Sequence, residues 1–218
     1  MHTCVPQIEQ YHDLIAAIVT ALEERDIYTQ CHSMRVADMS QKIASLLNLS
    51  EKETELIHIA AHLHDIGKIG IDDAILRKAG KLNDEEWEII KSHTTIGYKI
   101  LHKIEAFAEV SRIVLYHHER WDGKGYEGIE KCNIPLGSRI IAIADSIDAM
   151  MSSRVYRTGL TSEKCYSEIQ KNVGKMYDPE IAPVVLENWK TIVEIRNDFS
   201  SSKSADIENI NCFMKDNH

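Results

Sequence analysis

The stretch from Ser50 to Lys68 reads SEKETELIHIAAHLHDIGK. Ser50, followed three residues later by Glu53, has the pattern of a capping box, which opens a helix. This helix is expected to run to His64 and to stop at Gly67. It ends on the adjacent pair His64-Asp65. Neighbouring side chains of a helix interior point about 100° apart, so two of them converge on one site most easily where a helix ends.

Apolar residues recur at helical spacing on both sides of this stretch. Asn83 with Glu86 forms a second capping box. Asp178-Pro179 predicts an N-cap and a first helical proline, opening a helix to about Arg196. The other expected helices are 7–24, about 36–48, 95–102, 108–118, 136–151 and 162–173. Strand alternation and hairpin turns are not evident, so the predicted fold class is all-α.

Length and composition indicate a soluble globular protein. The chain has 218 residues, of which 44% are hydrophobic and 27% charged, which is ordinary for one domain with short appendages. We expect an N-terminal helix over 1–26, a domain over 27–197 and a polar, disordered tail over 198–218. The net charge of −9 argues against DNA or RNA duplexes and anionic membrane surfaces as partners, since it repels them at long range.

The cysteines point to a reducing compartment. There are five of them, and no CxxC occurs, so neither a disulfide framework nor a cysteine zinc site is expected. The N-terminus lacks the regions of a signal peptide, and no apolar run is long enough for a membrane span. We therefore expect a cytoplasmic protein.

The placement of the 11 histidines is informative. His32 and His93 lie near expected helix starts, and His117-His118 lies at a helix end. Asp145 is flanked by isoleucine and alanine, and a buried carboxylate needs a partner or a metal. Asp148 lies on the same side of that helix, where it either supports the site or is simply solvated; we expect the second.

The remaining histidines are expected to be packed or surface residues. His58 and His62 form an i, i+4 pair that could bind a metal, but they lack a clear third partner. The loop Trp121-Asp-Gly-Lys-Gly-Tyr126-Glu-Gly128 is rich in glycine. Its glycines would let the backbone approach a ligand closely, or they make a flexible connection between helices. The histidines expected to be packed or surface residues also include His2, His12, His102 and His218.

Taken in order, these segments resemble the HD-GYP family, a subgroup of the HD phosphohydrolase superfamily. The resemblance extends from about Asp26 to about Trp189, and it implies an HD-type helical bundle. It rests on several motifs in order: HSMRV from His32, HDIGK from His64, His93, HHERWDGKGY from His117, Asp145, and RVYR from Arg154 to Arg157.

Members of this family hydrolyse cyclic dinucleotides, chiefly cyclic di-GMP, at a two- or three-metal centre. The resemblance implies that Asp65 bridges two metal ions and that Lys68 contacts the scissile phosphate. It also implies nucleotide contacts by Gly125, Tyr126, Arg154 and Arg157. The implied ligands of the first metal are His32, His64, Asp65 and Asp145, and those of the second are Asp65, His93, His117 and His118.

Two positions depart from the family pattern. Glu127 replaces the proline of the Gly-Tyr-Pro signature, which should leave the loop less stiff and adds a negative charge near the expected anion. Tyr28 stands where three-metal members carry a glutamate, so we expect two metals. The imidazole and carboxylate ligands suit several divalent ions, and the resemblance favours iron or manganese.

Two divalent ions outweigh the charges of the two aspartates by about +2, so they can attract an anionic substrate into an acidic chain. The expected activity is hydrolysis of cyclic di-GMP to linear pGpG, with GMP as the alternative end product. Two alternatives stay open: a phosphohydrolase of another nucleotide such as cyclic GMP-AMP, or a low-activity cyclic dinucleotide sensor. A homodimer through the first helix and a regulatory or diguanylate cyclase partner are further expectations.

Overall fold

The computed structural model describes residues 12–23, 31–78, 80–153 and 158–197, and within these ranges no β-strand is found. The all-α prediction is therefore confirmed. The helices are α1 (His12–Glu23), α2 (His32–Leu46), α3 (Glu51–Leu63), α4 (Asp73–Leu76), α5 (Asp84–Lys91), α6 (His93–Leu101), α7 (Ala108–Leu115), α8 (Leu136–Met151), α9 (Ser162–Lys171) and α10 (Ile181–Glu187).

Local sequence signals set several helix ends. Ser50 and Glu53 form the predicted capping box before α3, and Asn83 and Glu86 form the one before α5. Asn48, just after α2, has a φ of 57°, which is the left-handed conformation that commonly ends a helix. Each of these ends depends on groups within a few residues, which is why the sequence alone predicts them.

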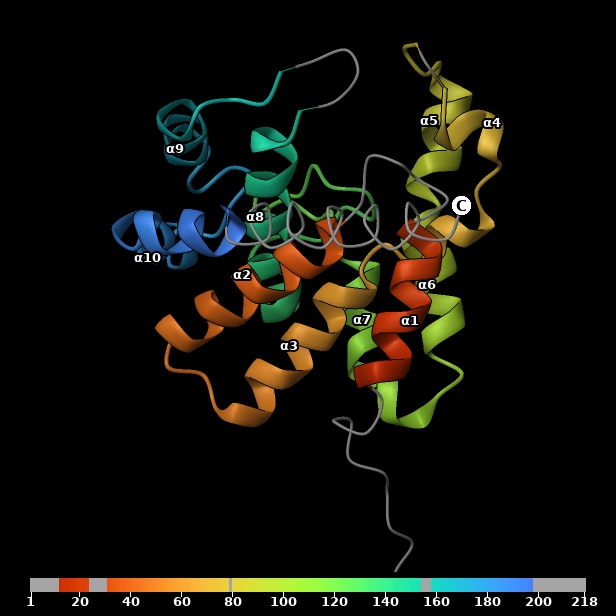
Figure 1. Cartoon of the computed structure of the whole chain (residues 1–218), viewed down its shortest axis with the longest axis horizontal. Helices are drawn as coiled ribbons and strands as arrows, with labels where there is room; N and C mark the ends of the chain where they lie inside the picture. Colours follow the sequence, from red (N-terminus) through yellow and green to blue (C-terminus); the bar gives the residue numbers. More distant parts are fainter. Residues whose placement is uncertain (1–11, 24–30, 79, 154–157, 198–218) are drawn as a thin grey trace, which may run out of the picture.

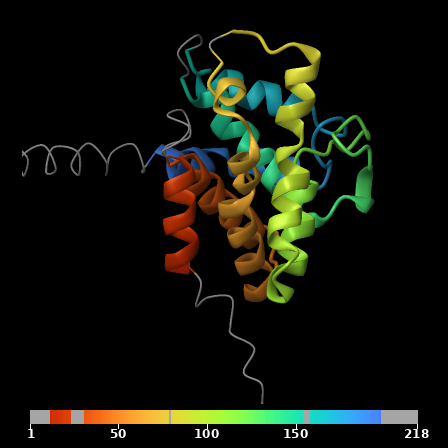
Figure 2. The same ribbon diagram turned by 90° about the vertical axis from the view of Figure 1, so that its right-hand side faces the viewer.

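The bundle is built around α2, α3 and α8. Helix α2 packs against α3 and α8, and α7 packs against α3 and α6. Figure 1 shows α9 and α10 on one side of this group and α4 and α5 on the opposite side, and Figure 2 shows α1 on the outside of the bundle. The centre of the core is formed by fully buried aliphatic side chains, among them Met39, Ile43, Ile59, Val110, Ile140, Ile143 and Ile147.

Gly67 brings two parts of the site together. It lies in the short 3-10 helix Ile66–Gly70, just after α3. A Cβ atom at this position would lie 1.8 Å from the carbonyl oxygen of His93 and 2.6 Å from the backbone nitrogen of Gly97. Only glycine permits this approach, so Gly67 both follows the end of α3 and lets α6 place His93 beside Asp65.

Asp178 caps the turn that leads into the last helix, as predicted, although regular α-helix begins only at Ile181. The Asp178 carboxylate accepts a hydrogen bond from the N–H of Glu180 at 2.7 Å and pairs with Arg139. The Asp178 carbonyl oxygen also accepts a hydrogen bond from the N–H of Ala182 at 3.0 Å, so Asp178 caps the first turn and α10 follows from Ile181. The chain then makes a turn at Asn188, whose side-chain amide donates to the Val184 carbonyl and so competes with the helical pattern. It is helical again over 189–197.

Candidate metal centre

Three elements deliver one cluster of ligands, which we call the His32 group: His32, His64, Asp65 and Asp145. His32, His64 and Asp65 each offer a ligand atom within 4.8 Å of the others. His32 comes from the first turn of α2, and the His64-Asp65 pair follows α3. From α8, the Asp145 Oδ1 atom lies 3.3 Å from His32 Nε2. The structure thus brings together the four residues predicted for the first metal.

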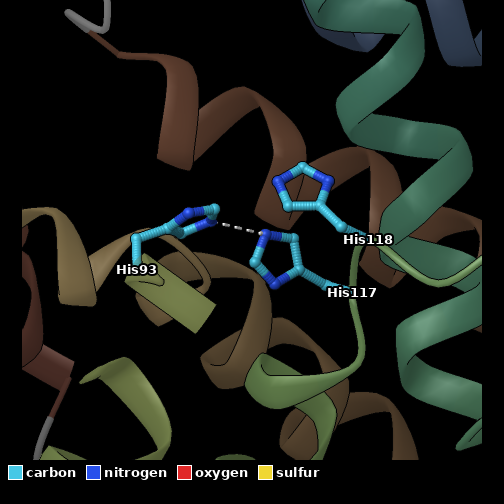
Figure 3. Close-up of side chains that lie close together, drawn as sticks. All are labelled: His93, His117 and His118. Atoms are coloured by element: carbon cyan, nitrogen blue, oxygen red, sulfur yellow. Dashed lines mark hydrogen bonds between the residues drawn. The ribbon is translucent and has the colours of Figure 1, made fainter. Parts of the chain in front are cut away.

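The second cluster, the His93 group, contains His93, His117 and His118, whose ligand atoms also lie within 4.8 Å of one another. Figure 3 shows the three rings turned toward a common point, with His93 on a different element from the adjacent pair. His93 opens α6, and the pair follows α7. The predicted members of the second group therefore also converge.

Asp65 lies between the two groups. Its Oδ2 atom is 3.4 Å from His64 Nε2, and its Oδ1 atom is 3.5 Å from His93 Nε2. The Nζ atom of Lys68 lies 2.7 Å from the same Oδ2. One carboxylate thus presents an oxygen to each histidine group, as a bridging ligand must.

Backbone carbonyls fix the orientation of three rings. The Nδ1 atoms of His64, His93 and His117 lie 2.7, 2.7 and 2.6 Å from the carbonyl oxygens of Ala61, Ile90 and Val114. Because a carbonyl oxygen only accepts hydrogen bonds, each Nδ1 carries the proton. Each Nε2 therefore directs its lone pair into the centre of the site.

This assignment changes the meaning of one short contact. His93 Nε2 and His117 Nε2 lie 3.4 Å apart (Figure 3). With both protons held at Nδ1, two lone pairs face each other, which is unfavourable unless a cation lies between them. The donor set of imidazole and carboxylate suits divalent transition metals. The residues present therefore fit a metal centre.

The electrostatics of the His93 group agree with this. Burial lowers the pKa of His93, and burial with the neighbouring histidines lowers the pKa of His117 well below the usual value. Burial likewise lowers the pKa of His118 to about 4. These imidazoles are therefore neutral near pH 7, which is the form that binds metals.

The His32 group has the opposite character. Burial acts to lower the pKa of His32, but hydrogen bonds to Asp145 and Asp148 outweigh it and raise the pKa to about 9. Burial acts to raise the pKa of Asp65, yet Lys68 and His64 hold it well below its usual range. The pKa of Asp145 is also low, because His32 outweighs its burial. The carboxylates are thus ionised and need positive charge nearby.

Asp148 is not the solvated residue that the sequence suggested. Its side chain is 1% exposed, and its Oδ2 atom lies 2.8 Å from His32 Nδ1. Arg35 also contacts it, with Nε 2.6 Å from Oδ1. The prediction failed because the face of α8 that carries Asp148 packs against α2 instead of facing solvent. Asp148 supports a candidate metal ligand.

The glycine loop carries Tyr126 to the edge of the His93 group. The ring centroid of Tyr126 lies 4.7 Å from that of His118 and 6.3 Å from that of Trp87. Burial, with Asp145 and Asp65 nearby, raises the pKa of Tyr126 to about 12, so its hydroxyl stays protonated and can donate a hydrogen bond. Trp87 was not among the predicted site residues, because helical periodicity does not distinguish a cavity wall from a packed face.

Glu119 anchors this loop. It is only 4% exposed, and its Oε1 atom accepts a hydrogen bond from the backbone N–H of Glu127 at 2.6 Å. A Cβ atom on Gly125 would lie 2.5 Å from the Glu119 Cα, so Gly125 is required for this packing. The backbone N–H that holds the loop is one that the family's proline lacks, whereas the side chain of Glu127 is exposed.

We therefore expect Glu127→Pro to destabilise the protein although it restores the family signature. Losing a hydrogen bond to a buried carboxylate should cost about 1–2 kcal/mol of unfolding free energy, or a fall of roughly 2–8 °C in Tm. Glu127→Ala is the matched control, since it removes the side chain and keeps the N–H. Thermal melts compare the two variants. If Glu127→Pro melts at or above the temperature of Glu127→Ala, this account of the loop is wrong.

A cavity of about 440 Å³ opens over both groups. Its wall includes His32, Asp65, His93, His118 and Asp145 at the base, Lys68 and Tyr126 beside them, and Lys78, Leu82 and Trp87 toward the rim. His117 is fully buried beneath the others. Trp87 is 45% exposed, so an aromatic face is available to a ligand.

The other predicted residues have separate outcomes. Arg154, Arg157 and Tyr28 lie outside the described residues. His58 and His62 lie outside both groups; the His58 Nε2 atom is 3.3 Å from Asp38, and the two rings are in edge contact.

Among the helices that the structure describes, each is too short or too polar to span a lipid bilayer.

Comparison with known proteins places this site in a family. The HD domain family matches residues 13–181 of the chain. The chain is 42% identical over 193 residues to a cyclic di-GMP phosphodiesterase of Thermotoga maritima, covering 85% of this chain and 52% of that protein. It is 36% identical over 191 residues to the 3'3'-cGAMP-specific phosphodiesterase 2 of Vibrio cholerae, covering 86% and 37%. The chain thus spans about half the length of the first relative and less of the second.

Solved structures agree on the fold. The cyclic GMP-AMP-specific phosphodiesterase V-cGAP3 of V. cholerae superposes with a TM-score of 0.65 at 20% identity, covering 84% of this chain and 49% of the other. An HDG"Y"P protein from Bdellovibrio bacteriovorus gives a TM-score of 0.63 at 18% identity, covering 84% and 65%. The resemblance that the motifs indicated is therefore confirmed, and the chain belongs to the HD domain family.

Proposed function

We propose that this chain is a metal-dependent phosphodiesterase that hydrolyses cyclic di-GMP to linear pGpG, with GMP as the alternative end product. The observation that carries the proposal is the pair of histidine groups joined by Asp65 at the base of a cavity. One group alone would hold one ion. Two groups that share a carboxylate suit a two-metal centre, which is the arrangement that recurs in phosphodiester cleavage.

We propose His32, His64, Asp65 and Asp145 as the ligands of one metal and Asp65, His93, His117 and His118 as those of the other. The favoured metal for the two ions is iron or manganese. Bound there, they would lower the pKa of a water molecule toward neutrality and offset the charge of the phosphate.

The side chains beside the ligands would act on the substrate. The Lys68 ammonium, close to Asp65, would contact a non-bridging oxygen of the scissile phosphate as negative charge develops. Tyr126, with its proton retained, would donate a hydrogen bond to the nucleotide, beside Gly125. Arg154 and Arg157 stay predictions for the second phosphate or a guanine base.

The cavity suits a nucleotide. Trp87 and Tyr126 line it together, and aromatic faces stack on nucleobases. Lys78, paired with Glu86 at 2.6 Å, adds a cation at the same wall. The named activities of the relatives in T. maritima and V. cholerae also lie within cyclic dinucleotide hydrolysis, which supports this substrate class.

The second candidate substrate is cyclic GMP-AMP. It is favoured by the V. cholerae relative of that specificity. The division of the chain at 26 and 197, the homodimer through α1, the regulatory or cyclase partner and the cytoplasmic location stay predictions from the sequence.

The test is a product assay. Protein reconstituted with Fe(II) or Mn(II) is incubated with cyclic di-GMP and, in parallel, with cyclic GMP-AMP, and the products are separated by chromatography. We expect metal-dependent linear dinucleotide from cyclic di-GMP, absent in a His64→Ala/Asp65→Ala double variant. Faster turnover of cyclic GMP-AMP would make the second candidate correct. Binding of the dinucleotide without turnover at any metal would point to a sensor instead.

A further inference from the structure

Asp148 joins a candidate metal ligand to the C-terminal part of the chain. Its carboxylate contacts His32 and Arg35, both from α2, and also Arg196, which lies in the helical segment 189–197. Arg196 Nε is 3.1 Å from Asp148 Oδ1, and its Nη2 donates to Ser152 Oγ at 2.9 Å. The family match ends at residue 181, so Arg196 reaches the site from beyond the matched region.

The segment that carries Arg196 is held in place by its own packing. Ile192 is fully buried in the core, and the indole nitrogen of Trp189 donates to Ser162 Oγ on α9 at 2.8 Å. The Arg196 side chain is 14% exposed. A long, charged side chain is seldom this buried unless it is paired; Arg196 is ion-paired with Asp148, without hydrogen-bond geometry at Nε, and is hydrogen-bonded to Ser152.

The contacts on Asp148 determine how His32 is oriented. Arg35 donates to both carboxylate oxygens, at 2.6 and 2.9 Å, and Arg196 adds a second guanidinium. A carboxylate that contacts two guanidinium groups is ionised and can only accept hydrogen bonds. His32 Nδ1 must therefore donate to it, and His32 Nε2 is left to face Asp145 and Asp65, at 3.3 and 3.9 Å.

We propose that Arg196 is a positioning residue for His32. Acting through Asp148, it sets the affinity of the His32 group for its ion, so the C-terminal segment forms part of the metal centre. Groups that hydrogen-bond a metal ligand directly, as Asp148 does with His32, commonly change metal affinity by 10- to 100-fold when they are removed, and Arg196 acts one step further out. Because Arg35 still holds Asp148 when Arg196 is removed, we expect the loss of Arg196 to lower metal affinity about tenfold. The inference rests on the metal centre proposed above.

The experiment is a Mn(II) titration of the metal-free full chain, followed by electron paramagnetic resonance. We expect Arg196→Met to weaken one of the two binding events about tenfold and to leave the other unchanged. The affinity of Arg196→Lys should lie between those of the wild type and Arg196→Met, because an ammonium keeps the charge but lacks the planar, multi-donor shape of a guanidinium. Lys190→Met is the matched control, since Lys190 is on the same segment and is 89% exposed.

The outcomes separate this inference from the proposed function. A wild-type chain that binds no metal would overturn both. Suppose that the wild-type chain binds two ions and is active, and that Arg196→Met and Arg196→Lys bind Mn(II) with the same affinities as the wild type. This result would overturn the inference alone, even if the variants melt at lower temperature. If Arg196→Met does not fold, Arg196→Lys carries the test, and weakening of one binding event would support the inference.

Discussion

Replacing Asp65 with asparagine should slow turnover of cyclic di-GMP by about a thousandfold or more and leave the protein with fewer than two bound metal ions. Asp65 places one carboxylate oxygen near His64 and the other near His93. An amide of the same shape offers only one acceptor oxygen, and its NH₂ group cannot bind a cation. The bridge between the two groups would therefore be lost while the volume of the side chain is kept.

The expected loss is large because the proposed metal centre would supply most of the charge stabilisation. A two-metal centre contributes several kcal/mol to the transition state, and each 1.4 kcal/mol is a factor of about ten in rate. We therefore expect Asp65→Asn to lower kcat by about a thousandfold or more. The measurements are metal content after desalting and single-turnover rates at saturating substrate.

Glu168→Gln is the matched control. It makes the same carboxylate-to-amide change on the exposed side of α9, where Glu168 pairs only with Lys171 in the described contacts. It should keep both the metal content and the rate. If Asp65→Asn retained two ions and near-normal turnover, Asp65 would not be the bridging ligand, and the assignment of the site would have to be revised.

Most of the candidate ligands could be predicted from the sequence because they lie at or next to helix ends; Asp145, inside α8, is the exception. Ser50 and Glu53 cap α3, so the position of His64-Asp65 at its far end follows from neighbouring residues. His117-His118 is likewise marked by the glycine loop after it. Motif order then groups residues that are far apart in the chain, which helical periodicity alone cannot do.

The supporting residues could not be predicted in this way, because they depend on long-range packing. Asp148 is 1% exposed, yet its spacing from Asp145 fits a solvated face equally well. A signal was present: α8 carries apolar residues on nearly every side, which favours a helix buried all round. Arg35, three residues after His32, could have suggested a carboxylate partner, whereas nothing local indicated Arg196.

The effect of Glu127 on the glycine loop also depends on tertiary packing that the sequence alone does not reveal. The replacement of proline by Glu127 suggests a less rigid loop when only the motif is considered. In the folded chain the buried Glu119 carboxylate accepts a hydrogen bond from the Glu127 N–H, so the replacement adds a contact to the loop. Whether a departure from a motif weakens a site thus depends on which backbone groups the fold places beside it.

Replacing Lys68 with alanine should slow turnover strongly without removing the metal ions. Lys68 Nζ lies 2.7 Å from Asp65 Oδ2, and the residue lines the cavity above the ligands. Ammonium groups are not metal ligands, since they have no free lone pair. The loss should therefore fall on the substrate. Removing one donor that stabilises transition-state charge typically lowers kcat by about 10²- to 10³-fold.

The way the loss divides between kcat and KM is what identifies the role of Lys68. An ammonium that acts on developing charge affects kcat, whereas one that only attracts the anionic substrate raises KM. We expect the larger change in kcat, with the content of bound metal unchanged. Lys68→Arg should recover part of the rate, because it keeps the charge but presents it in a different shape.

Lys99→Ala, on the exposed side of α6, makes the same loss of charge outside the cavity and should leave turnover unchanged. Two results would contradict the assignment of Lys68. A wild-type kcat in Lys68→Ala would mean that the metal centre alone carries the phosphate charge. Loss of metal from that variant would mean that Lys68 acts on Asp65, holding the bridging carboxylate in place instead of contacting substrate.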